Sequence, residues 1–382
     1  MKISISTNTL SNALTLVAAS INARSSLPIL SNVCILVDSD NIQFIGCNQD
    51  IEQRVTIPVS DVEVSGDGGI TLPFKKLFDL VKQANQDSVA IIDVDDKLAA
   101  SLKFKGQRSK YTLRALDADS YPYILMDNET VQASFEIESA SLLSAMSPVE
   151  GSMAHQDVRY FLNGMYFEKD KDSLLLVATD GHRLSMSKIN DLQGDNQNAT
   201  SAILPRDSQR TLNSFLKSLA SDAMVNVTIT NGHFIFKSND KTFTSKLVDG
   251  RFPDYRRVIP RDNDIELAVN RNELINACRR ASILANEKFR GVRLTLNGKS
   301  DAIALTSNNP EQEEASEDVV FESLDGLTGK LELGVNIDYL LNAALSLSGD
   351  IIDIQFRDEN ASLMIKDRVS DDTTHVVMPM RL

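Results

Sequence analysis

The sequence predicts an α+β protein built from three similar domains in one chain. Three observations carry this prediction. Sequence anchors recur at a nearly constant interval, which is 132 residues for Leu10, Leu142 and Leu274. Each copy repeats one order of strand and helix patterns, and 382 residues exceed one ordinary core. A chain of this length holds about two or three domains of roughly 100–200 residues. The period is far longer than a solenoid unit, so each copy is a whole domain.

Three ordered sets of anchors define the repeat. The segments LSNALTLV, LLSAMSPV and LINACRRA begin at Leu10, Leu142 and Leu274. The segments IGCNQD, VATDGH and LTSNNP give the matching positions Asn48, Asp180 and Asn308. In the third set, ITLPFKKLFDL and AILPRDSQRTL share Pro73 and Pro205, whereas LELGVNIDYLL has Val335 near this place. We therefore place the domains at 1–131, 132–263 and 264–382.

The elements of each copy follow one order. An alternating strand opens each copy (KISIS, ASFEIE or IELAV) and precedes a helix. In the first copy this helix has apolar residues at i, i+3 and i+4, and Ser6 or Thr7 is expected to cap it; Asn270 is expected to cap its counterpart in the third copy. Strands such as NIQFIGC, SLLLVAT and AIALTS lead to a second helix, expected after Thr71, after Pro205 and at Asn336, and further strands finish the copy.

Such a unit lays two helices on one face of a sheet and leaves sheet edges that must be paired or blunted. Copies joined edge to edge would pair those edges. Three joined copies would form an arc, and an arc closes only with another copy of itself. A head-to-tail contact repeated by a twofold axis closes such an arc into a ring.

Composition excludes several classes of protein. The hydrophobic fraction of 42 % excludes a disordered chain, and no apolar run approaches the roughly 20 residues of a membrane span. The N-terminus lacks a secretory pattern. The odd, scattered cysteines Cys34, Cys47 and Cys278 argue against a disulfide framework or a zinc site. We expect a cytoplasmic protein without metal, cofactor or membrane contact.

The formal charge of −14 disfavours non-specific binding of nucleic acid, unless basic residues gather on one face. The predicted helices do carry basic residues: Lys75, Lys76, Lys82, Arg206, Arg210, Lys217, Arg271, Arg279 and Arg280. The helix NIDYLLNAALSL carries none. These residues either form solvated helix faces or make loose, salt-screened contacts to phosphates.

The segment VATDGHRLSM places Asp180, His182 and Arg183 within four positions. A hydrolase using Asp180 and His182 would need a nucleophile or a metal beside the histidine. The other histidines form no HxH or HExxH spacing, and no GxSxG elbow is present. Asp-Gly between two strands is also typical of a plain hairpin turn. From the residues alone, a turn, a ligand pocket and an enzyme all stay open.

Five runs, in order along the chain, resemble the bacterial sliding clamps, the processivity subunits of replicative DNA polymerase III: VATDGHRL, LVDGRFPDYRRVIP, ANEKFRGVRL, NNPEQEEA and VVMPMRL. The first copy matches less closely, and the loop 190–200 is longer. The resemblance implies three DNA-clamp domains per chain and a head-to-tail homodimer with pseudo-sixfold symmetry. Helices would line the hole of this ring, and sheets would lie outside. Such a ring encircles duplex DNA of any sequence, tethers the polymerase and catalyses no reaction. A protein-interaction scaffold that does not bind DNA is the alternative.

The resemblance also implies sites. The DNA contacts would be Arg24, Gln156, Tyr160 and Arg206. A hydrophobic pocket for short partner peptides would comprise Leu162, Thr179, Gly181, His182, Arg183, Leu184, Pro253, Arg257, Val258, Asn336, Tyr339, Ser362, Val376, Met378, Pro379, Met380, Arg381 and Leu382. Its guests would be the polymerase III catalytic subunit, the clamp loader, and other polymerases and repair proteins that carry short clamp-binding peptides. Taken alone, the terminal MPMRL could be a frayed tail, but its apolar residues favour a docked one.

The implied dimer interface has two sides. Lys76, Arg114 and Tyr121 of the first copy would face Ile283, Leu284, Phe289, Glu311, Glu313 and Glu314 of the third copy in another chain. We expect Ile283 and Leu284 to be buried there, and Leu284→Asp to give monomers. Complementary charge would set the head-to-tail direction more than the affinity. Taken alone, the acidic run could equally be a solvated loop.

Overall fold

The computed structural model describes the chain except residues 23, 24, 26, 125, 127, 128, 191, 193–198 and 382. The first copy contains β1 (Lys2–Ser6), α1 (Thr7–Val17), β2 (Asn32–Val37), β3 (Asn41–Cys47), β4 (Ile51–Pro58), β5 (Glu63–Ser65), β6 (Gly68–Pro73), α2 (Phe74–Gln83), β7 (Val89–Val94), β8 (Ala99–Phe104), β9 (Lys110–Arg114) and β10 (Leu116–Asp117). The second contains β11 (Val131–Glu138), α3 (Ser139–Glu150), β12 (Gly164–Asp170), β13 (Ser173–Thr179), β14 (Arg183–Ile189), β15 (Thr200–Pro205), α4 (Arg206–Lys217), β16 (Met224–Thr230), β17 (His233–Ser238) and β18 (Lys241–Lys246). The third contains β19 (Ile265–Asn270), α5 (Arg271–Ala281), β20 (Gly291–Asn297), β21 (Ala302–Asn308), β22 (Glu314–Asp325), β23 (Lys330–Asn336), α6 (Ile337–Ser346), β24 (Ile351–Phe356), β25 (Leu363–Asp367) and β26 (Thr373–Val377).

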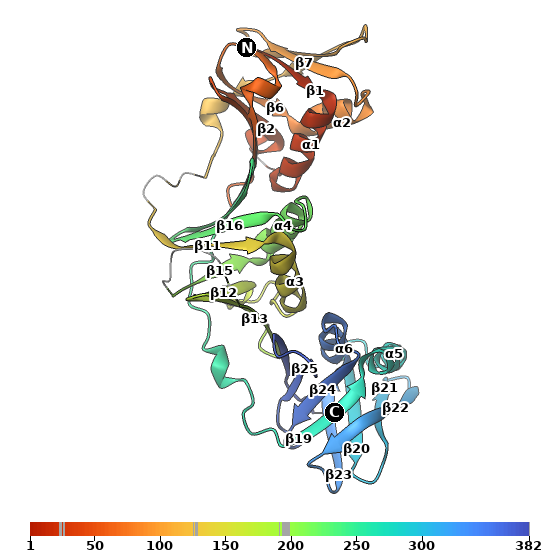
Figure 1. Ribbon diagram of the computed structural model, residues 1–382. Coiled ribbons are helices and arrows are strands. Elements are labelled where there is room, and N and C mark those ends of the chain that lie inside the picture. Colours follow the sequence, from red (N-terminus) through yellow and green to blue (C-terminus); the bar gives the residue numbers. More distant parts are fainter. Residues whose placement is uncertain are drawn as a thin grey trace. The chain divides into compact units, whose positions relative to one another are not determined.

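The predicted α+β repeat is confirmed. Each copy runs strand, helix, four strands, helix and three strands, and the first copy adds the short strands β5 and β10. In the third copy, α5 and α6 lie side by side on one face of the strands (Figure 1). Their inward faces meet a continuous apolar core that includes Leu274, Cys278, Leu340 and Ile354. The three cysteines form no disulfide and are buried.

Helix starts follow from capping. The Ser6 hydroxyl accepts the Thr9 N–H at the start of α1, and the Asn270 side chain accepts two N–H groups at the start of α5, as predicted. The second helix of the first copy, expected after Thr71, begins at Phe74, because β6 continues to Pro73 in its ladder with β2.

The copies join through their sheets. Strand β4 of the first copy pairs antiparallel with β18 of the second, and β14 of the second pairs with β26 of the third. The two junctions share one register: Val55 faces Lys241, and Ser187 faces Thr373, each 132 residues further along. The result is a nine-stranded and a twelve-stranded sheet, beside the five-stranded sheet β5-β1-β7-β8-β9.

Contacts divide the chain into two compact units: residues 1–140, 193–198 and 207–247, and residues 141–192, 199–206 and 248–382. The first unit holds the β4–β18 junction and the second holds the β14–β26 junction. Among the described helices, none is long and apolar enough to cross a membrane.

One anchor of the repeat is displaced by one residue. Asn48 and Asp180 each accept two backbone N–H groups within their hairpin turns, Asp50 and Ile51 in one case and His182 and Arg183 in the other. In the third copy, Asn309 rather than the predicted Asn308 receives such a bond, from the Glu313 N–H. In all three copies the acceptor is the first residue after the strand, because Cys47, Thr179 and Asn308 still form ladder pairs.

Candidate functional site

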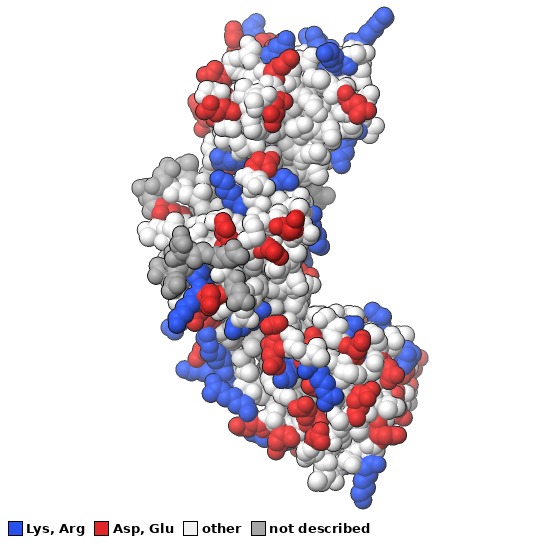
Figure 2. Space-filling view, in the orientation of Figure 1, with Lys and Arg blue, Asp and Glu red and all other residues white. Residues whose placement is uncertain are grey.

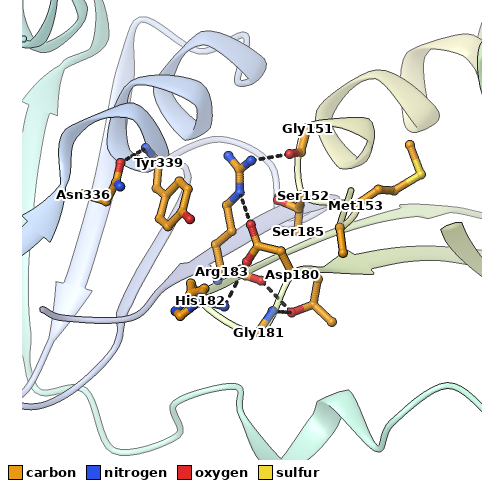
Figure 3. A network of polar contacts seen from close by, with 12 residues as sticks. Gly151, Ser152, Met153, Asp180, Gly181, His182, Arg183, Ser185, Asn336 and Tyr339 are labelled. Carbon is orange, nitrogen blue, oxygen red and sulfur yellow. Dashed lines mark hydrogen bonds and ion pairs between the residues drawn. The ribbon is translucent and has the colours of Figure 1, made fainter. Parts of the chain in front are cut away.

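The turn between β13 and β14 is held by its own side chains (Figure 3). The Thr179 hydroxyl donates to the Arg183 carbonyl at 2.6 Å and accepts the Gly181 N–H at 3.1 Å. The carboxylate of Asp180 accepts backbone N–H groups and the Arg183 Nε at 3.1 Å. Gly181 has φ +91°, a backbone conformation that L side chains rarely adopt, and a Cβ there would lie 3.0 Å from the Arg159 guanidinium, so a substitution would strain the turn. Asp180 is thus engaged in shaping the turn.

Arg183 lies at the centre of the site. Its guanidinium donates to the Gly151 carbonyl beyond α3, pairs with Asp180, and stacks on the Tyr339 ring of α6 at 4.4 Å (Figure 3). Arginine suits this place because its planar charge can stack and donate at once. The second and third copies are therefore tied together at the turn.

An apolar cluster lies beside the turn. Leu162, Leu184 and Val376 are each 2 % exposed and pack with Phe252 and Tyr255. At the same cluster Phe252 stacks on Tyr166, with 4.6 Å between ring centroids. Three predicted pocket residues are brought together here from β14, β26 and the turn before β12.

The C-terminal segment runs alongside. The Met378 N–H donates to the His182 carbonyl at 3.0 Å, and the Met380 N–H donates to Gly334 in β23 at 2.8 Å. Met378 and Val258 are 46 % and 49 % exposed beside this segment and the apolar cluster. The tail is therefore docked up to Met380, and Leu382 lies outside the described residues.

The remaining predicted pocket residues differ in their contacts and in their exposure. The side chain of Asn336 caps α6 and also donates to the Phe289 carbonyl, and Arg257 pairs with Asp254. Pro253, Arg257, His182 and Arg381 are exposed, and Ser362 and Pro379 are half-buried. The site thus has an apolar floor with a polar, solvated rim.

A buried polar chain crosses the β14–β26 junction, and no sequence pattern pointed to it. His375 is 3 % exposed; its Nδ1 meets the Ser185 hydroxyl at 2.7 Å, and its Nε2 meets the Ser346 hydroxyl at 2.8 Å. Ser185 in turn meets Ser152 at 2.7 Å. Burial, reinforced by the charge of Arg183, lowers the pKa of His375 from 6.5 to about 4. The imidazole is therefore neutral in the folded protein at neutral pH.

This burial predicts an acid-sensitive junction. An unfolded histidine binds a proton near pH 6.5 whereas His375 does so near pH 4, so stability is full above pH 6.5 and falls as the pH drops towards 4. The loss should reach about 3 kcal/mol of unfolding free energy. His375→Phe should flatten this dependence in denaturant titrations between pH 7 and 4.5, whereas the exposed His155→Ala should not. Equal slopes for His375→Phe and the parent would contradict the assignment.

The predicted DNA-contacting residues differ in exposure and in hydrogen bonding. Gln156 and Tyr160 are exposed, the latter at 57 %, and Gln156 has a positive φ of 55°. Arg206 is half-buried and donates to the Met153 carbonyl at 2.6 Å, so its charge is partly engaged. Arg24 lies outside the described residues. Acidic and basic side chains are interleaved on the face that Figure 2 shows.

The predicted interface residues are mostly accessible. Ile283 is 77 % and Phe289 60 % exposed, Leu284 is half-buried, and Lys76, Arg114 and the three glutamates are exposed. Tyr121 is the exception: it is 3 % exposed, and its hydroxyl accepts the Cys47 N–H at 2.9 Å within the first copy. Its side chain is therefore unavailable to another chain.

Arg159 was absent from the sequence-based site, although it lies against the turn. It pairs with Asp157 at 2.7 Å and donates to the Asp180 carbonyl at 3.1 Å. The Arg159 guanidinium holds the pKa of Asp157 down at about 2. A charged residue in an exposed loop carries no sequence signal for such a contact, which depends on the fold of β13 and β14.

Comparison with known proteins covers the whole chain. Models of the DNA polymerase III beta subunit match residues 1–126 (N-terminal domain), 136–254 (central domain) and 256–381 (C-terminal domain). The beta sliding clamp of Pseudomonas aeruginosa is 36 % identical over 382 residues, and that of Escherichia coli K12 is 34 % identical over 384; each match covers all of both chains.

Solved structures agree with this sequence similarity. The crystal structure of the P. aeruginosa DNA polymerase III subunit beta superimposes with a TM-score of 0.93 at 35 % identity, and both chains are covered completely. The repeat, the edge-to-edge sheets and these matches lead to one conclusion: the chain belongs to the bacterial beta sliding clamp family of DNA polymerase III.

Proposed function

We propose that two copies of this chain close head to tail into a ring that slides on duplex DNA and tethers the replicative polymerase. The observation that carries the proposal is the repeated junction: β4 pairs with β18, and β14 pairs with β26, in one register. Continuing that pattern calls for a third junction between β22 and β9. Among the described strands, each of these has a free edge along the equivalent residues. The predicted limits 1–131, 132–263 and 264–382 are proposed as the three domains.

The register of the third junction follows from the first two. Glu52 faces Thr244, and Leu184 faces Val376. Glu52, Leu184 and Glu314 each form the last pair before their hairpin loop, with Cys47, Thr179 and Asn308 respectively. The ladders of β8–β9, β17–β18 and β25–β26 likewise align Thr112 with Thr244 and Val376. Glu314 of one chain should therefore face Thr112 of the other.

Charge supports this direction of closure. The exposed β9 carries Lys110 and Arg114 on either side of Thr112, and β22 opens with Glu314 after Glu313. Opposite charges diagonal to one another across an antiparallel pair stabilise it modestly and disfavour wrong partners. The exposed Ile283 and Phe289 would supply the apolar part of the interface.

Cysteine pairs should report this register. Thr112→Cys with Glu314→Cys in one chain should give a covalent dimer on mild oxidation, because facing Cβ atoms in an antiparallel pair lie about 4.5–5.5 Å apart. The native cysteines are buried and should not interfere. The mismatched pair Thr112→Cys with Asp318→Cys should stay uncrosslinked. Electrophoresis without reductant reads the result, and equal crosslinking of both pairs would rule out the register.

The ring would hold DNA loosely. Helices α2, α4 and α5 carry basic residues, whereas α1, α3 and α6 carry none. Sparse phosphate contacts leave the ring free to move, and contacts to base edges would instead fix it at one sequence. We propose Arg24, Gln156, Tyr160 and Arg206 as the contacts, with retention coming mainly from encirclement.

We propose that partner peptides bind over the apolar cluster of Leu162, Leu184 and Val376, with Val258 and Met378 as exposed walls. The predicted pocket residues together form this site. Methionine walls can adapt to several guests, and polar rim groups can hold a peptide backbone. The polymerase III catalytic subunit, the clamp loader and repair proteins would share it. A similar clamp from P. aeruginosa has been solved bound to griselimycin, so we propose that this chain also holds compact ligands.

The chain would act in the cytoplasm as a tether and not as an enzyme. The Asp180 carboxylate accepts two backbone N–H groups, which supports a structural role for it in the turn.

A test of topology decides the function. After loading by the clamp loader and ATP, the protein should stay on circular duplex DNA through gel filtration and leave within minutes of linearisation. A groove binder would be retained equally on both forms, and equal retention would overturn the proposal.

A further inference from the structure

A cavity that is separate from the apolar cluster described above lies on the third copy, on the face of β20, β21 and β23. Its volume is about 750 Å³. The residues that line it and matter here are Gly291, Arg293, Thr306, Asn308, Glu314 and Met380. Met380 also belongs to the proposed peptide pocket, so the two sites are continuous.

The same face is covered in the other two copies. After the last strand of each copy, the chain runs back beside the strand that precedes the second helix. In the first copy Leu116 pairs with Thr71. In the second copy the Val248 N–H donates to the Ile203 carbonyl, and in the third the Met380 N–H donates to the Gly334 carbonyl. In the first copy the segment continues into Tyr121 and Ile124, which are buried on that face. In the second copy Phe252 and Tyr255 are buried in the same way. No described segment crosses this face in the third copy.

The residues that bind the covering segment in the first copy have counterparts that line the open groove of the third copy. In the first copy the Tyr121 hydroxyl accepts the Cys47 N–H at 2.9 Å and lies 3.3 Å from the Asn32 and Ile45 carbonyls. The strand ladders of the two copies match Cys47 with Asn308, Asn32 with Gly291, and Ile45 with Thr306. The Glu52 carboxylate accepts the Ile124 N–H at 3.0 Å, and its counterpart is Glu314. All four counterparts line the groove.

The floor of the groove is more polar than the equivalent covered faces of the first and second copies. Arg293, paired with Glu332 at 2.9 Å, stands where the first copy has Cys34 and the second has Tyr166. A polar floor is stable in water when empty, whereas the apolar floors require permanent cover. These features fit an exchangeable occupant.

We propose that this groove docks an extended, tyrosine-bearing segment of a partner protein whose clamp-binding peptide occupies the adjacent pocket. The tyrosine hydroxyl would meet Asn308, Gly291 and Thr306, and a backbone N–H three residues later would reach Glu314. This proposal rests on the proposed function, because it extends the same peptide site. A second copy of the chain is the other conceivable occupant.

A peptide tests the groove directly. Fluorescein-labelled ADSYPYI, the chain's own residues 118–124, should bind the full-length protein saturably in anisotropy titrations. Thr306→Trp, which fills the groove from its half-buried floor, should weaken binding at least fivefold, and so should phenylalanine in place of the first tyrosine of the peptide. Val369→Trp, at an 87 % exposed site outside the lining, should have no effect. Absence of saturable binding, or unchanged binding to Thr306→Trp, would overturn the proposal.

Two further comparisons separate the possible failures. The purified polymerase III catalytic subunit should bind Thr306→Trp about tenfold more weakly, while a short pocket peptide should bind it normally. If Val258→Asp weakens both and Thr306→Trp weakens neither, the groove fails and the pocket stands. If Val258→Asp weakens neither, the pocket itself fails. If ADSYPYI binds an Ile283→Asp monomer but not the dimer, the second copy fills the groove and the proposal is wrong.

Discussion

Ile283→Asp should convert this clamp into monomers. The side chain is 77 % exposed in the single chain, so the substitution should leave the fold of its own copy intact. In the proposed ring the same position is covered by the first copy of the other chain, and an unpaired carboxylate buried there costs several kcal/mol. A loss of about 3 kcal/mol corresponds to a dissociation constant raised more than 100-fold.

Sedimentation velocity across a concentration series measures the effect, and circular dichroism checks the fold. Val369→Asp introduces the same charge at an 87 % exposed site and should remain a dimer. The monomer should also fail to stay on circular DNA. Leu284→Asp should give monomers too, but Leu284 is half-buried within its own copy, so Ile283 is the cleaner position. A dimer that survives Ile283→Asp at low concentration would refute the interface.

The regular parts of this fold are predictable because the repeat reports them three times. Helix α1 buries Leu10, Ala13, Leu14 and Val17, the residues whose spacing predicts it. Pairing of the copies at their edges also follows from the need to cover strand edges. What fails is the exact end of a strand. Asn309 rather than Asn308 caps its turn because Asn308 still pairs with Glu314 in the strand ladder, and no period in the sequence reports where a strand ends.

Residues at the junctions could not be predicted for a different reason. Ser185 and His375 are 190 positions apart and meet only because β14 pairs with β26. The equivalent place at the other junction has Gln53 and Phe243, so the repeat gives no hint of a histidine there. Tyr121 shows the converse. The resemblance to sliding clamps implied an interface role for it, yet the chain folds back after β9 and buries the ring in its own copy.

Val258→Asp should abolish most of the affinity for partner peptides without disturbing the ring. Val258 is 49 % exposed beside a cluster that already contains Leu162, Leu184 and Val376, so it offers apolar surface to a guest and does not support the core. Losing that contact and adding a desolvated carboxylate should together cost about 2–3 kcal/mol, which makes the complex about 30- to 150-fold weaker.

The measurement is anisotropy of a labelled clamp-binding peptide from the polymerase III catalytic subunit, titrated with each variant. Val369→Asp is the matched control, since it makes the same substitution at an exposed valine of the third copy, and its affinity should equal that of the parent. Both variants should remain dimers and stay on circular DNA when loading is forced at high loader concentration. Processive synthesis should then fall only for Val258→Asp, because encirclement persists while the tether is lost. If peptide affinity were unchanged in Val258→Asp, the pocket would have to lie elsewhere on the chain, and the exposed Met378 wall would lose its assigned role with it.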